Sequence, residues 1–318
     1  GDIADTATLT ATDDVSVATI LNAGGTITLT ARDMASAGSL VSDNGGVFVS
    51  AAAIDIGNAN AAEMLDLEAS AGDLMLGTGM AGMAADLDAT GEVEVTTSLI
   101  AGGAITIDAG GLADLGLIRS TGSSVTVFAD AIDADTVQAQ GGALMLTADN
   151  GNLTLGSGTA STTATLQTTG GAGDVQVTTS LASGEAAMIS SVGDARLGSV
   201  SATTGNVVVT AAAGEVTGVN GGNANLAANG MDADVLVTGG TLARLGTISA
   251  DRSIDVTADT ISVDSATTAD GLLSLVADAG SVSLGSGVIG TTATLTATDD
   301  ITVSTLNAGG TISLTAGG

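Results

Sequence analysis

The sequence predicts an all-β fold, a parallel β-solenoid of about 15 coils with about 20 residues per coil, where a coil is one full turn of the solenoid. Three observations predict it. Short aliphatic blocks recur at a regular spacing, aliphatic and polar residues alternate within each block, and glycine pairs separate many of the blocks.

The spacing of the blocks sets the size of a coil. Blocks of the form x-φ-x-φ-x-Ala, in which φ is aliphatic, recur with one long step between Asn223 and Ser253 and a mean step of about 20 residues. They begin near Thr6, Thr26, Val47, Met64, Ala85, Ala104, Ser124, Ala143, Ala164, Ala187, Asn206, Asn223, Ser253, Leu272, Ala293 and Thr311. Two or three short strands and their corners fill about 20 residues.

Alternation within a block predicts a strand. Ile27 and Leu29 alternate with threonines, a period of two that puts the aliphatic side chains on one face and the hydroxyls on the other. Gly24 and Gly25 precede this strand and favour a corner, since glycine adopts backbone angles that other residues avoid. No sustained 3.6-residue period occurs, so we expect almost no helix.

The sequence also contains a repeat that is much longer than one coil. Residues 6–31 recur almost unchanged as residues 292–316, a super-repeat of about 286 residues. Residues 142–169 align without gaps with residues 271–298. Both termini lie in ordinary repeat sequence without a capping pattern. We therefore expect residues 1–318 to form one continuous, uncapped solenoid, a window of a longer repetitive chain or filament.

Composition agrees with stacked coils. Each coil would pair with the next about 4.8 Å away, with inward aliphatic side chains in columns along the axis. A narrow interior suits Ala and Val and disfavours rings, and Phe48 and Phe128 are the only aromatic residues. Proline is absent, as expected where nearly every strand needs its N–H groups for pairing.

The charge balance excludes several functions. The chain has 318 residues with 35 acidic and 5 basic side chains, a formal charge of −30, and it lacks Lys, His, Cys, Trp and Tyr. Imidazole, thiolate and Schiff-base chemistry are therefore absent, as are the usual zinc, haem and iron–sulfur ligands. The negative charge disfavours nucleic acid, and no apolar run reaches the roughly 18 residues that a membrane helix needs.

One recurring motif resembles a known family. The pattern Ala-Gly-Gly-[Thr/Ala]-[Ile/Leu]-x-[Leu/Ile]-x-Ala at residues 23–31, 101–109 and 308–316 resembles the haemagglutinin repeats of filamentous haemagglutinin-like bacterial exoproteins. The resemblance implies a right-handed parallel β-helix and export by two-partner secretion. That family also carries an Asn-Pro-rich secretion domain, and a chain without proline contains none.

Paired carboxylates raise the possibility of an enzyme. Parallel β-helices include polysaccharide lyases and hydrolases, and a glycoside hydrolase needs carboxylates around the scissile bond. Asp13-Asp14 and Asp299-Asp300 are adjacent acids, but both pairs stand at the same place in the repeat, between two strands. We interpret them as corner residues that accept backbone N–H bonds. We expect no enzymatic activity and assign no catalytic residue.

Calcium binding is a second possibility. Acidic side chains occur at Asp133 and Asp135 and at Asp251, Asp255 and Asp259. The calcium-binding nonapeptide Gly-Gly-x-Gly-x-Asp is absent, so we interpret these acids as a solvated face. We assign no metal ligand and no cofactor, and expect at most diffuse Ca²⁺ bridging of the acidic surface.

Two further motifs support no site. The Thr-x-Thr rows at residues 6–12 and 26–30 resemble ice-binding ladders, but the equivalent outward positions become acids at Asp66 and Asp86, as on an ordinary solvated face. Gly-Ser-Gly at residues 156–158 and 285–287 opens no helix and leads to no lysine, so phosphate binding is unsupported.

These features favour a mechanical function. We expect a structural protein that forms a filament or stalk on the bacterial cell surface, outside the cell, with further copies of itself, end to end or side by side, as partners. An adhesin for host or neighbouring cells, or for biofilm attachment, is the alternative. Its ligand would bind the longest irregular stretches, which we expect at residues 43–60 and 214–243. A polysaccharide-active enzyme ranks third.

Overall fold

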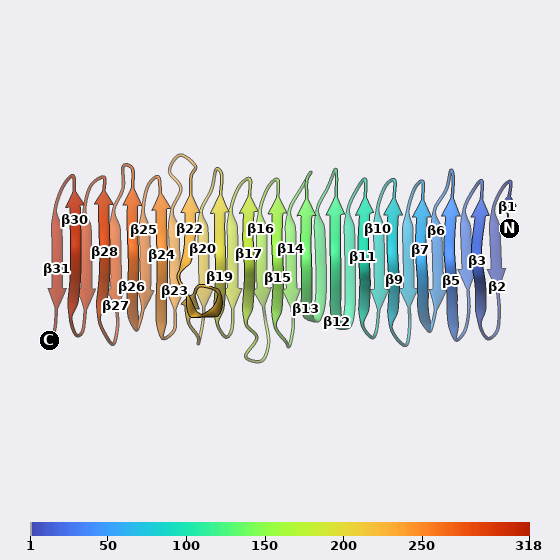
Figure 1. Ribbon diagram of the computed structural model, residues 1–318, viewed down its shortest axis with the longest axis horizontal. Coiled ribbons are helices and arrows are strands. Elements are labelled where there is room, and N and C mark those ends of the chain that lie inside the picture. Colours follow the sequence, from blue (N-terminus) through green and yellow to red (C-terminus); the bar gives the residue numbers. More distant parts are fainter. Residues whose placement is uncertain (1) are drawn as a thin grey trace. The chain divides into compact units, whose positions relative to one another are not determined.

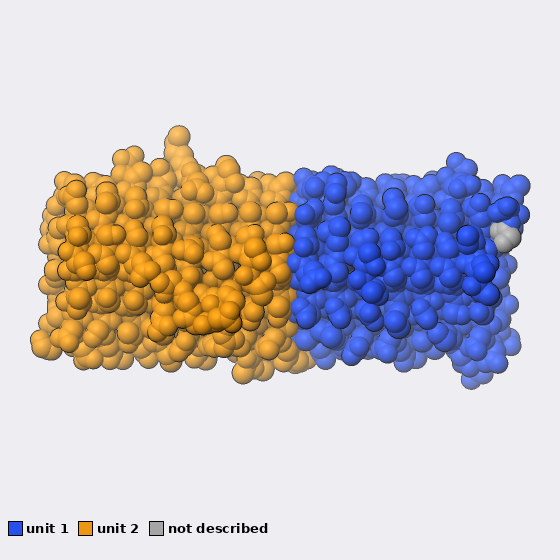
Figure 2. Space-filling view, in the orientation of Figure 1, with its two compact units in different colours: residues 1–149 blue, residues 150–318 orange. Residues whose placement is uncertain are grey.

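The computed structural model describes residues 2–318 and is a parallel β-solenoid of the right-handed type, with about 16 turns of about 20 residues. Strands hold 67% of the chain, which confirms the predicted fold class. The chain divides into two compact units, residues 1–149 and residues 150–318 (Figure 2). Continuity of the solenoid through both units stays a prediction.

In residues 1–149, a short and a long strand alternate along the chain, and each pairs in parallel with its equivalent in the next coil (Figure 1). The short strands are β2 (Ala7–Thr10), β4 (Ile27–Thr30), β6 (Val47–Ala51), β8 (Leu65–Ala69), β10 (Ala85–Ala89) and β14 (Leu144–Ala148). The long strands are β3 (Val15–Ala23), β5 (Met34–Ser42), β7 (Ala53–Ala61), β9 (Leu74–Ala81) and β11 (Val93–Ala101). β1 (Asp2–Ile3) pairs with the end of β3, and β12 (Ile105–Ser120) and β13 (Val125–Ala139) each join a short and a long strand.

Residues 150–318 repeat this plan. The short strands are β16 (Ala164–Thr168), β18 (Ala187–Ser191), β20 (Val207–Ala211), β23 (Val235–Gly239), β25 (Ile254–Ala258), β27 (Leu273–Ala277), β29 (Ala293–Ala297) and β31 (Ile312–Ala316). The long strands are β15 (Leu153–Ala160), β17 (Val175–Ser183), β19 (Ala195–Ala202), β24 (Leu242–Ala250), β26 (Thr260–Thr268), β28 (Val282–Ile289) and β30 (Ile301–Ala308). One long strand is interrupted, as β21 (Val216–Thr217), the 3-10 turn η1 (Val219–Gly221) and β22 (Ala224–Ala228).

The register between paired long strands is interrupted in the middle of the strands, a position that we call the bend, and glycine occupies it in several coils. Gly38 and Gly57 occupy this position in successive coils, and a Cβ on Gly57 would lie only 2.7 Å from the carbonyl oxygen of Gly38. The backbones of neighbouring coils therefore approach closely at the bend. A side chain there would have to push the two coils apart.

The core is aliphatic. Among the described residues, every buried hydrophobic side chain is Ala, Val, Ile or Leu. The coil of β8 and β9 illustrates the packing, since Leu65, Leu67, Leu74 and Leu76 are all 0% exposed. Phe128, at 37% exposed, faces outward, in agreement with the predicted narrow interior. Outward positions are polar or mixed, as the alternation predicts.

The structure corrects two expectations. Residues 43–60 are not an irregular stretch, because β6 and most of β7 lie within them and pair in register with neighbouring coils. The block near Asn223 is not a short strand: β22 is the second half of a long strand, and the next short strand, β23, begins at Val235. Its sequence alternates as a short strand does, so alternation alone could not separate the two.

Other expectations are confirmed. Helix is nearly absent from the described residues, with η1 the single short turn, and residues 214–243 do contain the irregular coil. Among the described residues, no helix is long and apolar enough to cross a membrane.

Candidate functional site

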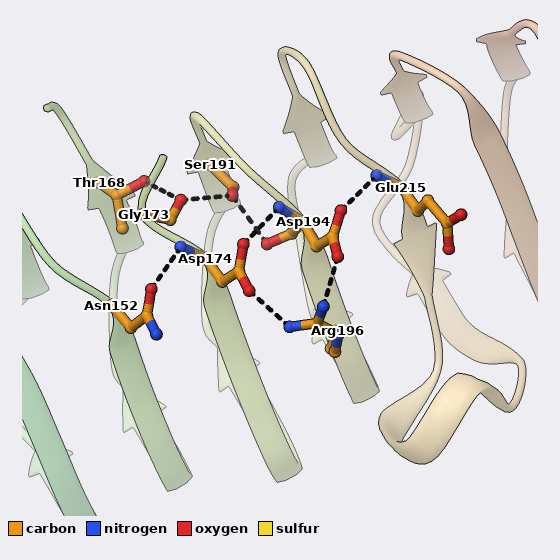
Figure 3. Close-up of polar contacts among 8 residues, drawn as sticks. All are labelled: Asn152, Thr168, Gly173, Asp174, Ser191, Asp194, Arg196 and Glu215. Atoms are coloured by element: carbon orange, nitrogen blue, oxygen red, sulfur yellow. Dashed lines mark hydrogen bonds and ion pairs between the residues drawn. The ribbon is translucent and has the colours of Figure 1, made fainter. Parts of the chain in front are cut away.

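A ladder of acidic and amide side chains lies at one corner of residues 150–318 (Figure 3). Asn152, Asp174 and Asp194 each stand directly before a long strand and accept the backbone N–H of the equivalent residue one coil later. The N–H groups of Asp174, Asp194 and Glu215 donate to these oxygens at 3.0, 2.8 and 2.9 Å. Each side chain therefore satisfies a backbone donor that the strand ladder leaves free.

Arg196 joins two steps of this ladder. Its Nη1 donates to Oδ2 of Asp174 at 2.6 Å, and its Nη2 donates to Oδ2 of Asp194 (Figure 3). The hydrogen bond with Asp174 is the main cause that raises the pKa of Arg196 above its usual value, with further support from the charges of Asp174, Asp194 and Glu215. The guanidinium thus clamps carboxylates of two successive coils.

Buried hydroxyl groups form hydrogen bonds with the backbone at the same corner. Thr168 and Ser191 are buried, and both donate to the carbonyl oxygen of Gly173, at 2.9 and 3.1 Å. Ser42 and Thr268 do the same elsewhere, donating to the carbonyl oxygens of Gly25 and Gly271. With their protons donated to backbone carbonyls, these hydroxyls stabilise corners.

A second arginine forms an ion pair at a corner farther along the chain. Arg252 donates through Nε to Oδ1 of Asp234 at 2.9 Å and through Nη2 to Oδ2, a bidentate pair, and Asp234 is only 8% exposed. A shallow depression of about 310 Å³ adjoins the pair, lined by residues that include Leu236, Leu272 and Asp255. It offers apolar and acidic contacts on an open surface.

The sequence interpretation missed both arginine clusters. A signal was present, since Asn, Asp or Glu precedes an aliphatic-x-aliphatic strand about every 20 residues at Asn152, Asp174 and Asp194, and Arg196 follows two residues after the last of these. Asp174 and Asp194 are one coil of 20 residues apart, and Arg196 lies two residues farther along the chain, so its contact with Asp174 spans 22 residues.

A column of carboxylates runs along the outer face of residues 1–149. Asp66 pairs with Asp86 in the next coil, and Glu68, Asp88 and Asp108 form a parallel row. Burial is the main cause that raises the pKa of Asp66, Asp86 and Asp108, and neighbouring carboxylates raise it further. Like charges one strand apart repel, so the column attracts counter-ions without forming a closed binding site.

The first predicted carboxylate pair lies in an exposed group of three. Carboxylate oxygens of Asp13, Asp14 and Asp33 lie within 4.8 Å of one another. Oδ1 of Asp14 accepts the backbone N–H of Met34 at 3.0 Å, which confirms the corner interpretation for this residue. A hydrogen bond with Asp33 is the main cause that raises the pKa of Asp13, followed by the charges of Asp14 and Asp33.

Among the described residues, the other predicted acids form no group of three carboxylates within 4.8 Å of one another. Asp299 and Asp300 are exposed at the corner between β29 and β30, and the N–H of Asp300 donates to Oγ of Ser281 at 3.3 Å. Asp133 and Asp135 are exposed on β13. Asp251, Asp255 and Asp259 lie before, on and after β25, and Oδ2 of Asp251 accepts the N–H of Asp232. This arrangement agrees with a solvated face.

The threonine and glycine motifs are parts of strands. Thr8 and Thr28 pair in register on the outer face, but Phe48 and Asp66 follow them in the same column, so the threonine row ends after two coils. Gly-Ser-Gly lies within β15 at residues 156–158 and within β28 at residues 285–287.

Residues 214–243 form the least regular surface. Asn220 in η1 and Asp232 in the following loop have positive φ angles of 57° and 60°. Met231 is 88% exposed. A side chain this exposed beside strained backbone is typical of a loop available for contacts.

No family model, curated protein or solved structure matches the chain. The haemagglutinin-repeat family therefore stays an interpretation of the sequence motif.

Proposed function

We propose that this chain is a structural protein, a segment of an extracellular bacterial filament or stalk. The observation that carries the proposal is the in-register pairing of coil on coil around an aliphatic core in both units. Each coil contacts mainly its neighbours, so stability grows by addition of coils and does not depend on a central site.

The polar groups support the same role. Arg196, Asp174 and the buried Ser191 form hydrogen bonds that join successive coils, and Oγ1 of Thr168 accepts the backbone N–H of Val192 from the next coil. Side chains that catalyse need a reacting atom within reach, whereas these contact backbone and one another. We propose the outside of the cell because the motif resembles secreted exoproteins.

Insertion of one coil tests the scaffold function. Duplication of residues 65–84, which hold β8 and β9, adds a unit whose strands match both neighbours. A scaffold should accept it, with an unchanged or raised midpoint of urea unfolding. Duplication of residues 70–89, which hold β9 and β10 and also add one coil, serves as the matched control. Loss of folding in both variants would contradict modular stacking.

Location needs its own experiment. Antibodies against the recombinant chain should label intact cells of the source bacterium as strongly as permeabilised cells. Labelling only after permeabilisation would overturn the extracellular assignment.

Adhesion is the second candidate, favoured by the exposed Met231 beside the positive-φ residue Asp232. Replacement of residues 229–233 by a short Gly-Asn corner should abolish binding to cell surfaces if the loop holds the ligand. The matched control is Met83→Ser, since Met83 is 61% exposed in a regular coil. Equal binding by all three proteins would exclude this loop as the adhesive surface.

A further inference from the structure

The dipeptide Asn-Gly meets different surroundings along this chain. It occurs at residues 44–45, 150–151, 220–221 and 229–230. Glycine has no Cβ, so its backbone nitrogen approaches the side chain of the preceding asparagine closely and can attack the amide carbon, Cγ. Hydrogen bonds that hold either group oppose this attack. The surroundings of each pair therefore decide whether it reacts.

The pair at the corner before β6 is held by hydrogen bonds. Nδ2 of Asn44 donates to the carbonyl oxygen of Gly24 at 2.9 Å, and the N–H of Gly45 donates to Oγ of Ser42 at 3.0 Å. Gly45 is buried, and a Cβ there would lie 2.7 Å from the backbone nitrogen of Thr26. The attacking nitrogen and the side-chain amide are therefore both fixed by other partners.

The pair between β22 and β23 lacks both restraints. In the part of the chain that the structure describes, neither the side-chain amide of Asn229 nor the N–H of Gly230 has a hydrogen-bond partner. Asn229 is exposed, whereas Gly230 is buried against the carbonyl group of Thr204. The carbonyl oxygen of Gly230 accepts the N–H of Ala233 at 3.1 Å. The turn is therefore formed while the two reacting groups stay free.

The position of this pair in the fold favours local motion. The loop between β22 and β23 projects past the corners of the neighbouring coils (Figure 1). It contains Met231, which is 88% exposed, and Asp232, whose φ angle is 60°. Opening of such a loop breaks no strand pairing. Asn229 can therefore reach the geometry of attack without unfolding of a coil.

We propose that Asn229 is a site of spontaneous deamidation. The backbone nitrogen of Gly230 loses its proton to hydroxide and attacks Cγ of Asn229. A C–N bond forms, the bond between Cγ and Nδ2 breaks, and Nδ2 leaves as ammonia with a proton from water. The five-membered succinimide then takes up one water molecule and opens at either of its two carbonyl groups. The products are aspartate and isoaspartate at position 229.

The reaction changes the surface of the loop and leaves the coils intact. One neutral amide becomes a carboxylate in a loop that already contains Asp232 and Asp234, and isoaspartate lengthens the backbone by one methylene group. β22 ends at Ala228 and β23 begins at Val235, so the change lies outside the paired strands. Older chains therefore carry more negative charge on their least regular surface than newly made chains. This inference does not depend on the scaffold function.

Peptide mapping by mass spectrometry tests the site, because trypsin cuts after arginine and places the two asparagines in the peptides 33–119 and 197–244. The folded chain is incubated at pH 9 and sampled over days. Deamidation at Asn229 should be at least about tenfold faster than at Asn44, where two hydrogen bonds have to break first. In concentrated urea the two rates should agree within about twofold, because the fold no longer distinguishes the pairs.

Two outcomes of this experiment would overturn the proposal. One is an equal rate at both asparagines in the folded chain. The other is aspartate without isoaspartate at position 229, since opening of a succinimide gives both products and direct hydrolysis of the amide gives only aspartate.

Two variants test the cause of the difference. Ser42→Ala removes the acceptor of the Gly45 N–H, so it should raise the rate at Asn44 at least about threefold and leave the rate at Asn229 unchanged. An unchanged rate at Asn44 in the folded variant would contradict protection by this hydrogen bond. The urea midpoint verifies folding, and the comparison within the unmodified chain decides the proposal if this variant does not fold.

Asn229→Gln tests the assignment to one residue. Glutamine would have to form a six-membered ring, so the variant should lose deamidation from peptide 197–244 and keep its urea midpoint, because residue 229 is exposed in a loop. The same peptide contains Asn220, and the N–H of the following Gly221 donates to the carbonyl oxygen of Gly218 at 3.2 Å. Deamidation of the peptide at an undiminished rate would place the reaction elsewhere and overturn the proposal.

Discussion

Arg196 on β19 binds Asp174, which lies one coil earlier, and Asp194, which lies in its own coil. One guanidinium therefore bridges two carboxylates from successive coils at one corner. The pairs are partly exposed, with side-chain exposures of 26% and 27% for the two acids, so their contribution to stability is modest.

Removal of this cation should destabilise the fold. We expect Arg196→Gln to lower the free energy of unfolding by about 1 kcal/mol, because it leaves two like charges adjacent. Urea unfolding monitored by circular dichroism measures the change. Arg32→Gln is the matched control, since Arg32 is exposed and should change stability by less than about 0.5 kcal/mol. Equal losses in both variants would contradict a clamp at Arg196.

The acidic column should make the fold more stable at mildly acidic pH. Asp66, Asp86 and Asp108 have raised pKa values in the folded chain, so the folded state binds more protons than the unfolded state between their raised pKa values and the usual value of about 3.8. Their contribution to stability therefore rises as the pH falls through that window. Thermal unfolding between pH 7 and pH 4 tests the sign.

A substitution isolates the same effect. Asp86→Asn should stabilise the chain at pH 7 by about 0.5 kcal/mol and flatten its pH dependence, because Asp86 stands next to Asp66. Asp255→Asn is the matched control, since Asp255 lies between Leu236 and Ser274. An unfolding midpoint that drops for Asp86→Asn would show that repulsion along the column is not significant.

The bend of the long strand should not tolerate a side chain. Gly57→Ala places a Cβ 2.7 Å from the carbonyl oxygen of Gly38, and we expect a loss of about 1–3 kcal/mol. Gly25→Ala is the control, because the nearest atoms to its Cβ lie 3.4 Å away. Similar stability of the two variants in urea would show that the coils can separate at the bend.

Divalent cations should act on the acidic surface as a diffuse atmosphere. We expect Ca²⁺ and Mg²⁺ at equal millimolar concentrations to raise the unfolding temperature by similar amounts, and EDTA to leave the fold intact. Differential scanning calorimetry measures both. Saturation at a one-to-one ratio of Ca²⁺ to protein, lost on Asp13→Asn, would instead indicate a specific site at Asp13, Asp14 and Asp33.

The alternating strand pattern in the sequence predicted most of the fold. Alternation at Ile27 and Leu29 and the spacing of about 20 residues predicted the core face and the coil, because period-two patterning is a local property. The block at Asn223 was misassigned, since η1 splits a long strand into a piece that resembles a short one. The Arg196 clamp escaped prediction because it joins side chains of successive coils, and their relative position depends on the register between strands.

The central claim is that successive coils stack in register, and distances between spin labels test it most directly. Thr28, Thr106, Thr126 and Met145 lie in one outward column of residues 1–149. Cysteine at residue 28, paired in turn with cysteine at residues 106, 126 and 145, places labels four, five and six coils apart. The stacked fold predicts separations of about 19, 24 and 29 Å, a constant step of about 4.8 Å. Separations that are broad, or that do not rise by one step per coil, would contradict it.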